Sequence, residues 1–165
     1  MEKNHPMEIS ERVSEIRKRI ADLLCNMGRL LSSLSRGVGR EATVFGGGDG
    51  GQACYTKFCT AVLPLEAMER ELAAEVLSLG ACVEAARVAC YVCPENRTAE
   101  ELLTRCRAME KEVQSFLFST LPAFRHSAAE AVDVEGEGRE AQAGRLGLLC
   151  GTLAGECNAL AVKLS

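Results

Sequence analysis

Aromatic residues make up only 4% of this chain of 165 residues, and tryptophan is absent. Runs of β-branched residues are also missing, and leucine and alanine supply most of the apolar 47%. β-Branched and aromatic residues favour strands, whereas leucine and alanine favour helices. The composition therefore predicts an all-α protein, and the length predicts a single helical domain over residues 1–165.

The chain also lacks a basic block, an apolar N-terminal segment and a long uninterrupted apolar run. Its net charge of −4 argues against direct binding of nucleic acid. The polar N-terminus does not resemble a signal peptide, and the most apolar window, 146–162, is interrupted by Glu156 and Asn158. We therefore expect a soluble, intracellular protein that binds neither nucleic acid nor a membrane.

Histidine occurs only twice, at His5 and His126, and each is isolated in the sequence. The sequence therefore offers almost no histidine that could activate a cysteine or serine as a nucleophile. Paired acids such as Glu69 and Glu71 fall on predicted solvent-facing helix surfaces, whereas acid–base catalysis needs a desolvated cleft. We expect no catalytic residues, no cofactor and no enzymatic activity.

Nine cysteines are scattered through the chain, mostly at positions that suit a helix interior. An odd number in an intracellular protein favours free, buried thiols over a disulfide framework. The pair Cys90 and Cys93 is the strongest candidate for chemistry, but it falls at a predicted helix C-terminus, and a redox pair needs an N-terminus. A zinc site would need a second pair of ligands at suitable spacing. We therefore interpret this pair as packing residues and predict no metal site, with zinc binding by Cys90 and Cys93 as the alternative.

The stretch from Ile9 to Leu34 carries the clearest pattern in the sequence. Its apolar residues alternate in steps of four and three, the a/d pattern of a helix that faces other helices. These seam residues are Ile9, Val13, Ile16, Ile20, Leu23, Met27, Leu30 and Leu34. Pro6 suits the first turn and Gly37 suits a stop, so we predict a helix over 6–36. Such a helix is marginal alone in water, so its seam must pack on other helices.

Three further helices are predicted, over 64–93, 98–121 and 140–164, with flexible connectors over 37–52 and 123–139. Pro64 marks the start of the second helix, whose seam includes Met68, Leu72, Val76, Leu79 and Val83.

The third and fourth helices carry signals of their own. Thr98 and Glu101 form a capping box at the start of the third helix, which ends before Pro122. The fourth carries a seam of Leu146, Cys150, Leu153, Cys157, Leu160 and Leu164, and a small-residue stripe of Gly147, Gly151, Gly155 and Ala159. That stripe would let another helix approach closely.

Together these patterns predict an antiparallel helical hairpin of the four-helix-bundle type, with coiled-coil seams and a Gly-rich connector. The patterns leave open whether the bundle closes within the chain or with a partner.

Two stretches of the chain carry a further pattern. The first runs from Glu11-Arg12-Val13 to Leu34-Ser35-Arg36, with isoleucines at helical spacing and an Asn26 to Gly28 step. The second, from Met68 to Leu79, is an apolar-Glu-x-Glu-Leu run. In this order the two stretches resemble the Mediator complex subunit 11 family, whose members are small helical components of the Mediator head. The Gly-rich connector, Pro64 and the helix from Thr98 depart from this typically shorter family.

This resemblance implies a hairpin that pairs with a hairpin of a Mediator subunit 22-like partner and contacts other head subunits in the nucleus. It further implies a non-enzymatic scaffold that supports initiation by RNA polymerase II. We expect the two seams to bind the partner through Ile9, Val13, Ile16, Ile20, Leu23, Met27, Leu30, Leu34, Met68, Leu72, Val76, Leu79 and Val83. The alternatives are a coiled-coil subunit of a vesicle-tethering or kinetochore complex, or a cysteine-ligated zinc protein.

Overall fold

Helices account for all the regular structure that the computed structural model describes, namely residues 6–40, 58–131 and 139–165. They are α1 (Pro6–Arg40), α3 (Leu63–Val92), α4 (Arg97–Ser115), the π-helix η2 (Phe116–Thr120), α5 (Leu121–Ala131) and α6 (Arg139–Leu164). The predicted all-α fold is confirmed. Residues 41–52 of the predicted Gly-rich connector lie outside the described residues. None of the described helices has the length and apolarity needed to cross a membrane.

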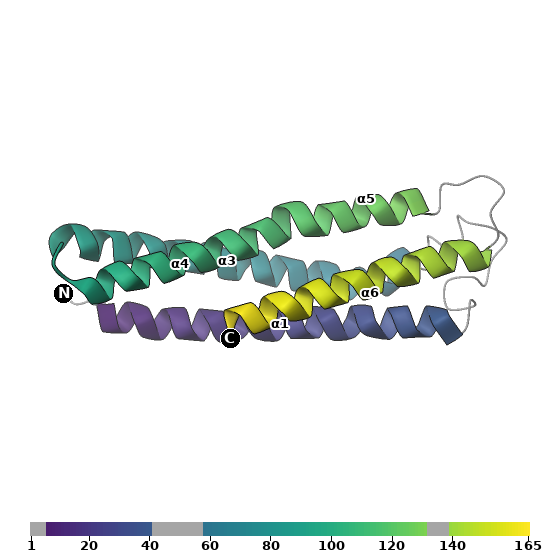
Figure 1. Ribbon diagram of the computed structural model, residues 1–165, viewed down its shortest axis with the longest axis horizontal. Coiled ribbons are helices and arrows are strands. Elements are labelled where there is room, and N and C mark those ends of the chain that lie inside the picture. Colours follow the sequence, from purple (N-terminus) through teal and green to yellow (C-terminus); the bar gives the residue numbers. More distant parts are fainter. Residues whose placement is uncertain (1–5, 41–57, 132–138) are drawn as a thin grey trace.

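Four rods pack side by side along their length: α1, α3, the continuous α4–η2–α5 and α6 (Figure 1). Consecutive rods run antiparallel, and α6 returns along the C-terminal half of α1. Ion pairs connect α1 to α3 through Arg19 and Glu75, at 2.8 Å, and α6 to α4 through Lys163 and Glu112, at 2.9 Å. The bundle therefore closes within the chain, which decides between the two arrangements that the sequence left open.

The seam of α1 shifts register once along its length. Ile9, Val13, Ile16 and Ile20 are buried as predicted, but the next buried residues are Leu24, Met27 and Leu31. The predicted Leu23, Leu30 and Leu34 are only partly buried at the edge of the core. A straight helix drifts by about 20° per heptad relative to a perfect seven-residue repeat. Over more than three heptads this drift brings the next residue in line with the core, so the strict heptad assignment was wrong in this half.

The bounds of α1 also differ from the prediction, because the helix continues through Gly37 to Arg40. A glycine within a helix costs only about 1 kcal/mol relative to alanine, so it does not by itself end one.

Pro64 stands in the first turn of α3, as predicted. A separate helical stretch, residues 58–61, precedes it, and the chain turns at Val62. Along α3 the predicted Leu72, Val76 and Leu79 are buried, whereas Met68 and Val83 are partly buried against the core.

The rod α4–η2–α5 corrects two predictions. Its N-cap is Asn96, whose side chain accepts a hydrogen bond from the Ala99 backbone N–H at 3.2 Å, so the capping box at Thr98 was wrong. The helix also does not end before Pro122, and the predicted connector over 123–139 was wrong for residues 123–131, which form α5.

A π turn explains how the helix passes Pro122. In η2 the N–H of Leu121 bonds the carbonyl of Phe116, which closes a turn that is one residue wider than an α-helical turn. A proline ring clashes with the preceding turn of a regular α-helix, and the wider turn gives it room.

The seam of α6 is buried as predicted, at Leu146, Cys150, Leu153, Cys157, Leu160 and Leu164. The small-residue stripe faces α1 only in part. A Cβ atom on Gly151 would lie 3.0 Å from Ser35 Oγ, whereas a Cβ atom on Gly155 would meet nothing within 4 Å. On the α1 side, a Cβ atom on Gly28 would lie 2.5 Å from Asn158 Oδ1. Gly28 and Gly151 are thus positions where α1 and α6 pack closely.

Candidate protein-interaction surfaces

The residues predicted to bind a partner lie inside the chain's own bundle. Ile9, Val13, Ile16, Ile20 and Met27 of α1 are at most 4% exposed. Leu72, Val76 and Leu79 of α3 belong to the same core, which also includes residues of α4, α5 and α6. A partner that bound through these seams would have to open the bundle first. Their role in partner binding stays a prediction, so the surfaces exposed by the closed bundle are the next candidates.

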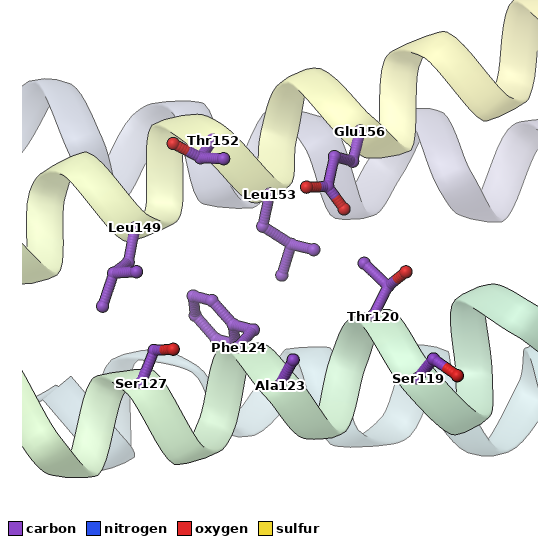
Figure 2. Close-up of a pocket in the computed structure, with 9 residues that line it drawn as sticks. All are labelled: Ser119, Thr120, Ala123, Phe124, Ser127, Leu149, Thr152, Leu153 and Glu156. Carbon is purple, nitrogen blue, oxygen red and sulfur yellow. The ribbon is translucent and has the colours of Figure 1, made fainter.

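An open cleft lies between the η2–α5 segment and α6. Its volume is about 380 Å³, and its lining comes from both rods: Ser119, Thr120, Ala123, Phe124, Ser127, Leu149, Thr152, Leu153 and Glu156. Figure 2 shows Leu149 and Leu153 of α6 and Phe124 of α5 pointing into the space between the two helices. These three side chains form an apolar floor, which we call the cleft floor.

The two rods are connected on either side of this cleft. At one end, Arg145 Nε of α6 donates a hydrogen bond to the carbonyl oxygen of Ala131, the last residue of α5, at 3.2 Å. At the other end, Lys163 Nζ pairs with Glu112 Oε1 on α4 at 2.9 Å. Arg145 thereby supplies a donor to one of the carbonyls that a helix C-terminus leaves without an intrahelical partner. The cleft therefore lies in a stretch where the rods are held at both ends.

The polar groups of the cleft are hydroxyl groups and one carboxylate. Four hydroxyl groups line it, from Ser119, Thr120, Ser127 and Thr152, together with the carboxylate of Glu156. Among the described lining residues there is no histidine or cysteine to activate a hydroxyl group.

This cleft was not predicted from the sequence, because residues 123–139 were assigned to a connector. The signal that could have revealed it is the helical spacing of Leu121, Phe124, Ala128 and Ala131, all of which are buried on α5.

A second exposed surface runs along α3 on the side away from the core. Its residues again alternate in steps of four and three, at Leu63, Ala67, Arg70, Ala74, Leu77, Ala81, Glu84, Val88 and Tyr91. All are exposed except Val88, which is half-buried. Leu77 and Tyr91 are 78% and 86% exposed, respectively. We call this set the outer stripe of α3. An amphipathic surface helix normally has one apolar side, whereas α3 has two.

Among the residues that the structure describes, the alternative zinc site gains no further ligands. Cys90 is half-buried and Cys93 is exposed at the end of α3, so the packing interpretation was wrong for Cys93. Among residues 6–40, 58–131 and 139–165, no group of three or more His, Cys, Asp or Glu side chains could hold a metal ion.

The buried cysteines are inert thiols held in the core. All eight cysteines of the described chain are free, and Cys82, Cys106, Cys150 and Cys157 are buried. Burial raises the pKa of the Cys150 and Cys157 thiols to about 12, and that of Cys106 to about 11. Since the thiolate is the reactive form, these cysteines serve as packing residues.

Comparison of the chain with protein-family models, with curated proteins and with solved structures finds no match. The α5–α6 cleft and the outer stripe of α3 are therefore the candidate interaction surfaces of the described bundle.

Proposed function

We propose that this protein is a non-enzymatic interaction subunit, resembling Mediator head subunit 11, that binds a helix of a partner protein in the α5–α6 cleft. The observation that carries the proposal is the apolar cleft floor, where the buried Phe124 and Leu153 and the partly buried Leu149 form the bottom of a cleft that is open to solvent. An open groove with an apolar floor and a polar rim is typical of surfaces that bind proteins.

The shape of the cleft favours a helix as its occupant. Leu149, Leu153 and Glu156 on one wall, and Thr120, Phe124 and Ser127 on the other, recur at intervals of about one helical turn. An amphipathic helix places side chains at the same intervals, so its apolar face can enter such a groove. The hydroxyl groups of the rim can bind polar residues beside that face, and Glu156 favours a basic residue on the incoming helix.

The internal closure of the bundle changes what the family resemblance implies for a partner. In the family, a hairpin of subunit 22 covers the hairpin of subunit 11. In this chain the rods α4–η2–α5 and α6 cover α1 and α3. We therefore propose that a subunit 22-like partner, or another head subunit, adds a helix to a complete bundle and does not supply half of it. The proposed setting is the nucleus, in support of initiation by RNA polymerase II.

A pair of matched threonine variants tests the cleft. Thr152 lines the cleft, and its hydroxyl donates to the carbonyl of Leu148 one turn earlier. Thr104 on α4 makes the same bond to Glu100 and lies outside the cleft residues. Both are exposed, so arginine at either position is expected to leave the fold intact.

The test is affinity purification of the tagged chain from the cells that produce it, followed by mass spectrometry of the proteins recovered. We expect to recover Mediator head subunits with the unchanged chain and with Thr104→Arg. With Thr152→Arg the recovered amount of these subunits should fall at least about tenfold, because a cationic side chain then fills the groove. Recovery of tethering or kinetochore subunits instead would refute the Mediator assignment. Equal recovery with both variants would refute the cleft as the binding site.

A further inference from the structure

The outer stripe of α3 is symmetric about its central residue. Leu77 stands in the middle, Arg70 and Glu84 stand seven residues before and after it, and Leu63 and Tyr91 stand fourteen residues before and after it. All five are exposed, and Leu77 is 78% exposed. The two charges of the stripe are thus equidistant from its centre and opposite in sign.

This arrangement of charge is complementary to itself in one orientation only. If two such helices cross antiparallel with a two-fold axis at Leu77, Arg70 of each copy lies level with Glu84 of the other, about 10 Å from the axis on either side. In a parallel pair at the same register, Arg70 would face Arg70 and Glu84 would face Glu84. Like charges directly opposite each other disfavour that orientation.

The remaining stripe residues suit the same antiparallel pair. Ala74 and Ala81 flank Leu77, and small side chains there leave space for the leucine of the opposite helix. At the two ends, Leu63 of one copy comes level with Tyr91 of the other. Glu84 already pairs with Arg87 in its own helix, but a carboxylate has lone pairs for a further donor.

Phe118 adds to this surface from the neighbouring rod. It is 72% exposed on η2, and it lines a groove of about 450 Å³ together with Arg70 and Ala73 of α3. An apolar side chain next to one half of the stripe extends the area that a second helix can cover.

We infer that the outer stripe binds the outer stripe of a second copy of this chain, in an antiparallel pair of α3 helices related by a two-fold axis at Leu77. The stripe is about 42 Å long and about 10 Å wide, so each copy buries roughly 400 Å². This is about half of what a standard stable interface buries, so the expected dimer is weak and reversible. The α5–α6 cleft lies on other rods, so this dimer does not depend on the function proposed for the cleft.

Sedimentation equilibrium of the purified full chain over a range of concentrations tests the inference. We expect a reversible monomer–dimer equilibrium. Leu77→Lys should raise the dissociation constant at least about tenfold, because it brings two ammonium groups together on the two-fold axis. Leu148→Lys, at a residue 71% exposed on α6, is the matched control and should leave the constant unchanged. Circular dichroism of each variant verifies that the helices remain.

A charge exchange tests the orientation. Arg70→Glu alone and Glu84→Arg alone should each weaken the dimer, because each puts like charges at both ends of the pair. The double variant Arg70→Glu/Glu84→Arg should restore the dissociation constant to within about threefold of the original. A chain that stays monomeric throughout, a dimer that tolerates Leu77→Lys, or a double variant no better than the single ones would overturn the inference.

Discussion

Arg125 on α5 and Glu69 on α3, 56 residues apart in the sequence, form a bidentate ion pair. Arg125 Nη1 donates to Glu69 Oε1 at 3.1 Å, and Nη2 donates to the other carboxylate oxygen. The hydrogen bonds to Glu69 raise the pKa of the Arg125 guanidinium. Both side chains are partly buried, so the pair holds α5 against α3 just after the π turn.

Arg125→Met should therefore reduce the free energy of unfolding by about 0.5–1 kcal/mol, because methionine keeps most of the apolar stem but not the ion pair. The matched control is Arg87→Met, which breaks a more exposed pair with Glu84 within one helix and should cost less. Urea unfolding of both variants measures the difference, and high salt should shrink the effect at Arg125. Equal losses of unfolding free energy in the two variants would mean that the long-range pair does not stabilise the packing of α5 on α3.

Gly28 of α1 is expected to resist large side chains because of its closeness to α6. Gly28→Leu has to displace Asn158, whereas Gly144→Leu extends into open space. We expect the first variant to lower the free energy of unfolding by about 1–3 kcal/mol and the second to change it little. At the open positions Gly144 and Gly155, alanine should stabilise the protein by about 0.5–1 kcal/mol each. Thermal unfolding of the four variants provides the comparison.

The buried thiols predict a loss of stability in alkali. The pKa of Cys150 and Cys157 is about 12 in the folded chain, and the ordinary value is 9.0. The unfolded chain therefore releases these protons first, so the stability they contribute is fully present below about pH 9 and is lost as the pH rises. Each thiol should contribute a slope of about 1 kcal/mol per pH unit near pH 10. Urea unfolding between pH 8 and pH 10 should show a shallower decline in Cys150→Ala/Cys157→Ala, and parallel declines would contradict the raised pKa values.

The π turn predicts a large effect for a one-residue deletion. Removing Ser119 would convert η2 to a regular α-helical turn, and α5 would keep roughly its present orientation because the wider turn already accommodates the extra residue. The ring of Pro122 would then clash with the preceding α-helical turn, so we expect the free energy of unfolding to fall by about 3 kcal/mol. Ser119→Ala, at the same exposed position, should change the stability by less than about 0.5 kcal/mol. A deletion variant as stable as the original would show that Pro122 does not need the wider turn.

The helices and most of the core could be predicted because they depend on local spacing. The seam of α6, from Leu146 to Leu164, was predicted residue by residue. This seam spans fewer than three heptads, so the drift of about 20° per heptad stays small and the 3-4 pattern keeps to one side of the helix. The break at Pro64 was also predictable from the fixed geometry of proline.

The sequence-based predictions were wrong where the helical period departs from the heptad or where contacts between distant residues decide the structure. Leu24 replaces Leu23 in the core because α1 follows its own helical period and not the heptad. Pro122 stays within a helix because packing of Phe124 and Ala128 favours a π turn over a break. The α5–α6 cleft could not be predicted once α5 was missed. The outer stripe of α3 was present in the sequence, but a helix with two apolar sides shows two overlapping patterns, and only the inner one was recognised.

The central claim of this account is that α6 of the same chain covers α1. Ser35 and Gly151 provide the sharpest test, because a Cβ atom on residue 151 would lie 3.8 Å from the Ser35 Cβ atom. This separation is close to the mean for a disulfide, about 3.8 Å. The double variant Ser35→Cys/Gly151→Cys, made with the exposed Cys93 changed to serine, can therefore be oxidised and examined by mass spectrometry of its peptides.

Ser33→Cys/Gly155→Cys is the matched control, because a Cβ atom on residue 155 meets nothing within 4 Å. The measurement is the yield of the peptide that joins residues 35 and 151, at a protein concentration low enough to leave the chain monomeric. We predict a nearly complete intrachain disulfide in the first variant and none in the control. A disulfide that forms only between chains, or no disulfide in either variant, would contradict the internal closure of the bundle.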